Sequence, residues 1–148
     1  MKLPTEIRER FRRYGRQGGR IRAARISPEE KKRIARQGAT ARWVRFRFGA
    51  SNFADLGLPG GATVDAGLAD LAAGRTTVES LLVSLAEPRL RREGVPIGAV
   101  EADPEQRLYE LLARKEGDLA HARYGARLRR MVSFADACHL ARIPARSA

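Results

Sequence analysis

The sequence has a single cysteine, Cys138, in 148 residues, which excludes an internal disulfide framework. A reduced, cytoplasmic setting fits this cysteine usage. No apolar run approaches the roughly 18 residues that a membrane span needs, and the first residues lack the apolar stretch of a secretory signal. We therefore expect a soluble, cytoplasmic protein without a membrane partner.

Groups that carry catalysis or bind metals are also scarce. His121, His139 and Cys138 are the only soft ligands, whereas structural zinc usually takes four. Cys138 and His139 are neighbours in sequence, so on a helix their side chains point in different directions. Asp118 and His121 are spaced to touch on a helix, but the simpler interpretation is a helix cap and a surface histidine. The glycines of residues 15–19 lack the spacing of a phosphate-binding loop. We expect no enzyme, metal or cofactor, with a small enzyme built on Asp118 and His121 as the remote alternative.

Acidic residues are rare in the first third of the chain. Residues 1–48 carry 16 Lys and Arg against 4 Asp and Glu, whereas residues 49–148 carry 13 of each. Leu, Ile, Val and Phe number 9 in residues 1–48 and 24 in residues 49–148. High charge with few apolar residues places the first segment near the boundary of disorder. We predict a basic helical arm over residues 1–49, whose order can depend on a partner, and a small helical domain over residues 50–148. Whether residues 1–26 fold alone stays open.

Strands are not supported, because β-branched residues rarely alternate with polar ones and the helix formers Ala, Leu, Arg and Glu dominate. The predicted fold class is therefore all-α. In the arm we expect a helix over residues 5–14, weakened by the glycines that follow, and a short helix over residues 20–25. Ser27-Pro28-Glu29-Glu30 is a capping box that starts a helix ending near Phe48.

Four or five short helices are predicted beyond residue 50. The start and stop signals are Thr63, Thr76 or Thr77, an interruption at Pro88, a capping box at Asp103-Pro104-Glu105-Gln106, an N-cap at Asp118, and Ser133 before a last segment. The tail after Pro144 is expected to fray.

The arm has the chemistry of a phosphate-binding segment. Thirteen of its sixteen basic residues are arginine, which donates to phosphates in a bidentate way. Glutamine side chains in the arm can read base edges. The candidate nucleic-acid-binding residues are Arg16, Gln17, Arg20, Arg22, Arg25, Lys32, Arg33 and Arg36. The candidate partner-binding residues are Trp43, Phe46 and Tyr124.

Stacking on bases is an alternative for the arm aromatics, although at least two are expected in the core. A DNA duplex, RNA and an acidic protein surface all remain possible partners for the arm, and a merely solvated charged face is the remaining alternative.

One stretch carries a family resemblance. It runs from Gly15-Arg16-Gln17-Gly18-Gly19 through Ser27-Pro28-Glu29-Glu30 to Ile34-Ala35-Arg36 and Ala41-Arg42-Trp43. This stretch resembles a basic segment of small bacterial proteins, several of which are similar to the antitoxin half of toxin–antitoxin modules or to small nucleoid proteins. Residues 50–148 are similar in style to helical proteins associated with a nucleotidyltransferase-type toxin. The resemblance implies a protein that binds a cognate toxin and DNA, and it transfers no catalytic motif.

The sequence therefore favours an antitoxin-like protein that contacts DNA through its arm and neutralises a toxin by helical packing. The alternative is a stand-alone nucleic-acid-binding protein of the nucleoid, or a transcriptional regulator. Neither the partner nor the oligomeric state follows from the sequence.

Overall fold

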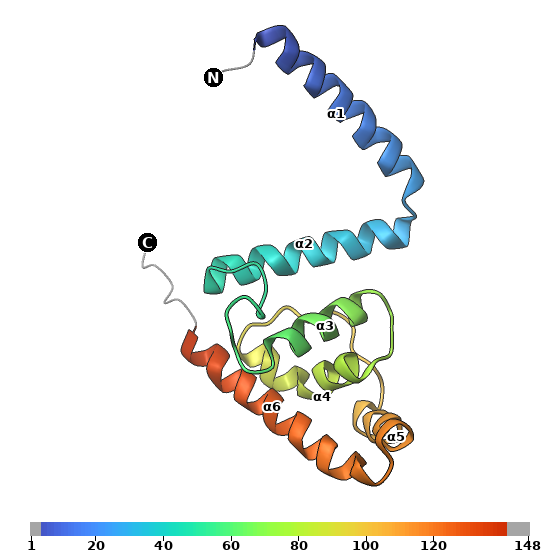
Figure 1. Ribbon diagram of the computed structural model, residues 1–148, viewed down its shortest axis with the longest axis vertical. Helices are drawn as coiled ribbons and strands as arrows, with labels where there is room; N and C mark the ends of the chain where they lie inside the picture. Colours follow the sequence, from blue (N-terminus) through green and yellow to red (C-terminus); the bar gives the residue numbers. More distant parts are fainter. Residues whose placement is uncertain (1–3, 142–148) are drawn as a thin grey trace. The chain divides into compact units, whose positions relative to one another are not determined.

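A computed structural model describes residues 4–141 (Figure 1). Its helices are α1 (Thr5–Arg25), α2 (Pro28–Phe48), α3 (Gly61–Ala72), α4 (Val78–Arg92), α5 (Pro104–Glu116) and α6 (Ala120–Ala141), with a 3₁₀ turn η1 (Gly117–Leu119). This range contains no β-strand, so the all-α prediction is confirmed. The expected fraying after Pro144 lies outside the described residues.

The chain divides into two compact units, Met1–Ala35 and Arg36–Ala148. The sequence suggested a division near residue 50, where the charge balance changes. The structural division falls earlier because the second half of α2 belongs to the second unit. There Val44 and Phe48 are buried in the hydrophobic core, so the end of this basic helix is also a core element.

Helix α1 is longer than the sequence predicted. It continues through Gly15, Gly18 and Gly19 to Arg25, where we expected a break. Each glycine weakens a helix by about 1 kcal/mol relative to alanine but does not forbid helical geometry. No residue of α1 is buried, so the helix gains no packing energy to offset this cost.

Helix α2 begins as the sequence predicted, after Ser27. The Oγ of Ser27 accepts a hydrogen bond from the backbone N–H of Glu30 at 3.1 Å, which satisfies a free donor of the first turn. The Glu30 carboxylate does not follow the expected capping-box role. It accepts a hydrogen bond from Arg33 Nη2 at 3.1 Å instead.

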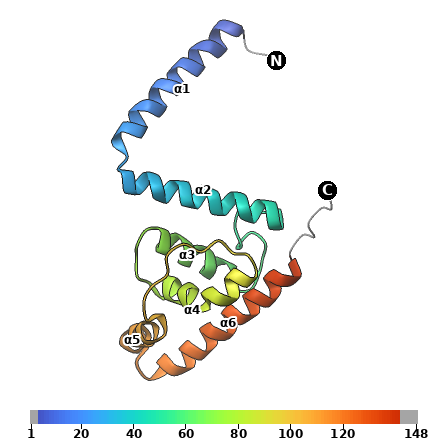
Figure 2. The same cartoon turned by 180° about the vertical axis from the view of Figure 1, so that it is seen from behind.

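The core of the second unit lies among α3, α4, α5 and α6. Helix α4 packs against each of the other three, and α5 packs against α6 (Figures 1 and 2). A chain of edge-to-face aromatic contacts runs through this unit. Trp43 contacts Phe48 and Phe48 contacts Phe53, each with ring centroids 5.6 Å apart, and Phe53 contacts Phe134 at 5.1 Å. These rings join the end of α2 to α6.

Two predicted helix starts in this unit are corrected. Helix α3 begins at Gly61 rather than after Thr63, because Gly60 adopts a left-handed conformation (φ 81°) that turns the chain into the helix. Asp103 precedes α5 with a positive φ of 46° and no side-chain capping bond, and Gln106 donates to Glu110 instead of closing a capping box. Thr77 does cap α4, in a capping box with Ser80.

Two predicted interruptions are absent from the described helices. Pro88 lies inside α4, which continues to Arg92. Helix α6 begins at Ala120, after the 3₁₀ turn that contains Asp118, and it passes through Ser133 without a break. Burial of Leu90 beyond Pro88, and of Phe134 beyond Ser133, favours helix continuity over the local breaking signal.

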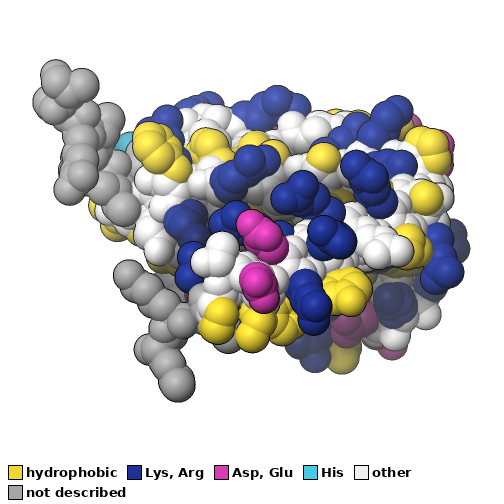
Figure 3. Space-filling view, turned by 90° about the horizontal axis from the view of Figure 1, so that it is seen from above, with side chains coloured by type: hydrophobic (Ala, Val, Ile, Leu, Met, Phe, Trp, Pro, Cys, Tyr) yellow, Lys and Arg dark blue, Asp and Glu magenta, His cyan; other side chains and the backbone are white. Residues whose placement is uncertain are grey.

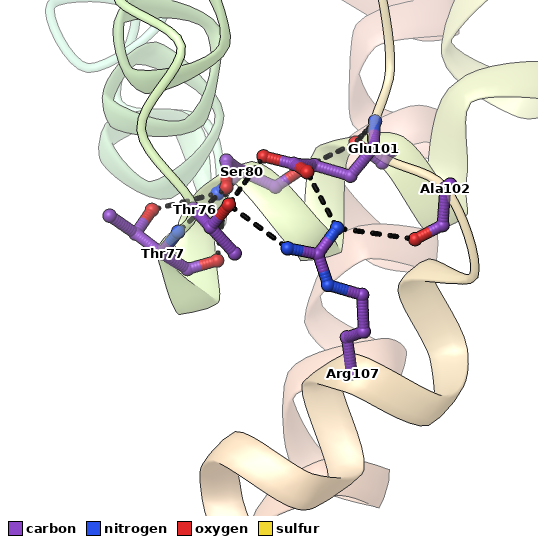
Figure 4. Close-up of polar contacts among 7 residues, drawn as sticks. Thr76, Thr77, Ser80, Glu101, Ala102 and Arg107 are labelled. Carbon is purple, nitrogen blue, oxygen red and sulfur yellow. Dashed lines mark hydrogen bonds and ion pairs between the residues drawn. The ribbon is translucent and has the colours of Figure 1, made fainter.

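A polar network fastens the α3–α4 turn to α5 (Figure 4). Arg107 Nη1 donates to Glu101 Oε2 at 2.7 Å, and its Nη2 donates to Thr76 Oγ1 at 3.1 Å. The Thr76 hydroxyl in turn donates to Glu101 Oε1 at 2.9 Å. Ser84 Oγ accepts from the backbone N–H of Glu101 at 3.0 Å and donates to the carbonyl of Ser80 at 2.8 Å. The connector before α5 is therefore held by side chains of three neighbouring elements.

Candidate nucleic-acid interface

The predicted nucleic-acid-binding residues are accessible. All are exposed except Arg33, which is half-buried. Arg16, Gln17, Arg20, Arg22, Arg25 lie on α1, and Lys32, Arg33 and Arg36 lie on α2. On the face that Figure 3 draws, lysine and arginine side chains are abundant and acidic ones are few.

Most arginines of α1 lack a carboxylate partner, whereas six arginines of the second unit have one. Apart from Arg8, no arginine of α1 forms an ion pair with a carboxylate within residues 4–141. In the second unit, six arginines beyond α2 each pair with an acidic side chain: Arg75, Arg91, Arg107, Arg114, Arg123 and Arg127. Other arginines of this unit, such as Arg42, Arg89 and Arg130, form no ion pair within residues 4–141. The α1 arginines other than Arg8 therefore keep their positive charge available to an external anion.

Helical geometry groups some of these residues and separates others. Successive residues of an α-helix are rotated by about 100°, so residues four apart share a face. Arg12, Arg16 and Arg20 consequently form one row along α1. Arg22 and Arg25 lie on other parts of its circumference. Arg12 was missed as a candidate, although the spacing of four in the sequence was the signal that identifies it.

On α2 the three predicted cations are also divided. Lys32 and Arg36 are four residues apart and share a face. Arg33 is turned toward Glu30, which neutralises it in part. Gln37, considered as a base-reading residue, is exposed and lies at the edge of a groove in the second unit.

The three predicted partner-binding residues do not form one surface. Trp43 is half-buried and packs edge-on against Phe48. Phe46 is 80% exposed, so it is the most accessible of the three. Tyr124 belongs to a separate cluster, with its ring 5.9 Å from that of Tyr109.

The Tyr124 hydroxyl is held in place by a carboxylate. It donates to Glu105 Oε1 at 3.2 Å. Burial and the hydrogen bond and charge of Glu105 raise the pKa of Tyr124 above its usual value of 10.0. This contact joins α5 to α6. Tyr124 is therefore partly exposed but also has a structural role.

A groove of about 660 Å³ lies in the second unit. Its walls come from the second half of α2, from α3 and from residues 96–99, and they include Trp43, Leu68 and Ile97. Asp65 lies at the groove, but its carboxylate is already engaged: it accepts from the backbone N–H groups of Phe53 (3.1 Å) and Ala54 (2.8 Å). The volume is in the range of ligand pockets, and the apolar walls suit a hydrophobic side chain of a partner.

The residues considered for catalysis do not form a common site. Cys138 is fully buried in the core, whereas His139 is exposed and its Nδ1 lies 3.1 Å from Glu93 Oε2. Asp118 and His121 are both exposed, on η1 and on α6. Within residues 4–141, no three His, Cys, Asp or Glu side chains cluster in a way that would hold a metal ion. Over the same range, no helix has both the length and the apolar character needed to cross a bilayer.

The comparisons with known proteins found no match. No known family model matches the chain, no curated protein matches it, and no solved structure matches its fold.

Proposed function

We propose that this protein binds nucleic acid through the basic arm and binds a protein partner through the second unit, in the manner of an antitoxin. The observation that carries the proposal is the contrast in arginine pairing. The α1 arginines beyond Arg8 have no carboxylate partner within residues 4–141, whereas six arginines of the second unit do. Unpaired arginines attract phosphates because binding releases the counterions condensed on the nucleic acid.

Duplex DNA suits the arm because its phosphates recur along an extended backbone. The row Arg12, Arg16 and Arg20 repeats at each turn of α1, about 6 Å apart along the helix axis. This spacing is close to that of successive phosphates on one strand, so a helix of this kind can contact several phosphates at once. Lys32 and Arg36 on α2 add a second pair of cations with the same spacing.

The salt dependence of binding to a duplex tests the nucleic-acid part. We expect the logarithm of the association constant to fall with the logarithm of salt concentration with a slope of about −5, corresponding to about six phosphate contacts. The triple variant Arg12→Gln, Arg16→Gln, Arg20→Gln removes three contacts and is expected to reduce the steepness by about 3. Fluorescence anisotropy with a labelled duplex measures both.

A matched variant separates specific contacts from net charge. Arg91→Gln, Arg114→Gln and Arg123→Gln remove the same number of charges, but from arginines that already pair with Glu87, Glu110 and Glu116. This variant should keep the slope of the unmodified protein. An equal loss in both variants, or a salt-independent interaction, would rule out the arm as the DNA-binding element.

The protein-partner part needs a separate test. The accessible apolar features of the second unit include Phe46 and the groove beside Trp43. A tagged copy of the protein is recovered from its native host, with and without nuclease. A single stoichiometric protein that survives nuclease and is lost in the Phe46→Glu variant supports a toxin-like partner. Recovery of proteins only in the untreated half would leave a stand-alone nucleic-acid-binding protein.

A further inference from the structure

Helix α1 carries an apolar stripe with a regular period. Ile7, Phe11, Tyr14, Gly18 and Ile21 follow one another at intervals of four, three, four and three residues. This alternation is the seven-residue repeat by which one helix packs along another. The four side chains of the stripe are between 40% and 67% exposed. We call this stripe, residues 7, 11, 14, 18 and 21, the α1 seam.

The α1 seam is narrow, and at Gly18 it has no side chain. At about 100° per residue its five positions fall within an arc of about 80°, which is the width of a helix–helix seam rather than of a broad apolar face. At Gly18, nothing lies within 4 Å of the point where a Cβ would stand. A side chain of a facing helix can therefore reach the backbone of α1 at this position, as a knob fits into a hole.

The charges beside the seam restrict what can bind there. Arg10 and Arg22 occupy positions that flank a seam of this register. The acidic residues of α1, Glu6 and Glu9, lie away from it on the helix circumference. Flanking charges select the partner of a helix pair, because opposite charges attract across the interface and like charges repel. The flanking arginines therefore favour a facing helix with glutamate or aspartate beside its own apolar seam.

The same charges argue against the other occupants of an apolar stripe. A second copy of α1 would bring only basic or neutral side chains to its flanking positions, so no carboxylate would face these arginines. Duplex DNA has no apolar surface that would cover Phe11 and Tyr14. A helix that lies in a membrane surface needs a broad apolar face, and the α1 seam has only four large apolar side chains in a narrow arc.

We propose that the α1 seam binds an amphipathic α-helix of an acidic partner protein. The row Arg12, Arg16 and Arg20 lies on the opposite side of α1, so the helix can hold a nucleic acid and the partner helix at the same time. The inference rests on the proposed function because it assumes that the protein has a protein partner. It adds a docking site on α1 to the surface proposed on the second unit.

The experiment uses the full-length protein and a synthetic helix. The probe is a four-heptad peptide with leucine at the seam positions and glutamate at the flanking positions. We expect this peptide to bind at micromolar concentration and to raise the helical signal at 222 nm. The variant Phe11→Gln, Tyr14→Gln, Ile21→Gln should weaken binding by about tenfold or more, since it removes three apolar side chains that the peptide would cover. Because α1 has no buried residue, unfolding of the second unit should not change in this variant.

Two controls make the outcome decisive. A peptide of the same composition, with its leucines moved off the seam, keeps the charge but loses the apolar face. The variant Arg12→Gln, Arg16→Gln, Arg20→Gln loses charge on the opposite side and should weaken peptide binding by less than about threefold, because these charges lie about a Debye length from the partner. Equal binding of both peptides would overturn the proposal, since attraction would then be purely electrostatic.

Further results would assign the seam to another occupant and would also overturn the proposal. One is binding to vesicles of phosphatidylserine and phosphatidylcholine that requires Phe11, without peptide binding. Another is self-association in sedimentation that the seam variant abolishes. The duplex-binding assay is run on the same variants. If the unmodified protein binds the peptide but no duplex, the proposed nucleic-acid function fails and the seam stands; the reverse result removes the seam only.

Discussion

In the second unit, Arg91, Arg107 and Arg114 each lie against a carboxylate, whereas the arginines of α1 other than Arg8 have no such partner within residues 4–141. The chemistry of the side chain is the same in both regions. In these three arginines of the second unit, the charge joins neighbouring turns and elements of the fold. On α1 it is available to something outside the chain.

Aromatic residues show the same difference. Phe53 is fully buried between Phe48 and Phe134, whereas Phe11 is 66% exposed on α1. The second unit thus carries its own hydrophobic stabilisation, and α1 does not. An isolated helix of this length with three glycines is marginal in water.

The largest expected effect comes from truncating one phenylalanine in each region. Phe53→Ala should lower the free energy of unfolding by about 3–5 kcal/mol, because it opens a cavity at the centre of the aromatic chain. Phe11→Ala should change it by less than about 0.5 kcal/mol, as expected for an exposed site. Urea unfolding followed by circular dichroism measures both. Comparable losses in the two variants would mean that α1 is part of the cooperative core.

A glycine-to-alanine pair should give effects of opposite sign. At Gly67, a Cβ would meet the carbonyl oxygen of Glu79 and would lie 2.5 Å from Val83 Cγ2, so Gly67→Ala should force α3 and α4 apart and cost about 1–3 kcal/mol. At Gly18 nothing lies within 4 Å of the point where a Cβ would stand. Gly18→Ala should therefore favour the helical state of α1 by about 1 kcal/mol and raise its helicity. Thermal unfolding reports the first and ellipticity at 222 nm the second. A stabilising effect at Gly67 would contradict the close approach of the two helices.

Removing one arginine from each region should separate stability from binding. Arg107→Gln breaks the contacts with Glu101 and Thr76 and is expected to cost about 1 kcal/mol of stability, since the guanidinium is partly solvated. Arg20→Gln should leave unfolding unchanged and weaken duplex binding instead. Chemical denaturation and anisotropy on the same two proteins test this, and a stability loss in Arg20→Gln would show that α1 is fastened to the fold.

The smallest expected effect is a pH dependence at the end of α3. Burial raises the pKa of Asp70, but hydrogen bonds from Thr77 and Arg75, together with the Arg75 charge, outweigh it and hold the pKa below 3.8. The folded state therefore prefers the ionised form. Its contribution to stability is complete above pH 3.8 and is lost as the pH falls through the lower pKa of the folded state.

The variant Asp70→Asn isolates this contribution. It should unfold more easily than the unmodified protein at neutral pH, by less than about 1 kcal/mol, because the ion pair is partly exposed. The difference between the two proteins should shrink as the pH is lowered below 3.8. Urea unfolding over a pH series measures it. A difference that stays constant in acid would mean that the ionised carboxylate is not what stabilises the turn.

Two helix caps follow directly from signals confined to a few neighbouring residues. Ser27 caps α2 and Thr77 caps α4, because a side-chain oxygen needs only to reach a backbone N–H three residues ahead. The same kind of signal failed at Asp103, where the backbone takes a left-handed conformation, and at Pro88, where α4 continues. At Pro88 the core side of the helix decides, since Leu90 beyond it is fully buried.

The arginines of the candidate nucleic-acid interface also have features that the sequence shows and features that only the structure shows. The excess of arginine in the first third is a property of composition, and the repeat of four residues in α1 follows from helix geometry. The carboxylate partners of Arg75, Arg107 and Arg123 lie five to seven residues away, and Arg107 also bonds Thr76, which is 31 residues distant. No periodic pattern identifies such pairs. The neutralisation of these three arginines therefore emerged only with the folded chain, whereas Arg91 with Glu87 and Arg114 with Glu110 have the helical spacing of four residues.

Composition and helical period thus account for the all-α fold, the basic arm and most of its exposed cations, because these depend on residues one or two turns apart. Packing accounts for the rest. The end of α2 joins the second unit through Val44 and Phe48, and Trp43 and Tyr124 lie in different clusters. These outcomes depend on contacts between residues far apart in the sequence, whose free energy appears only when the helices are assembled.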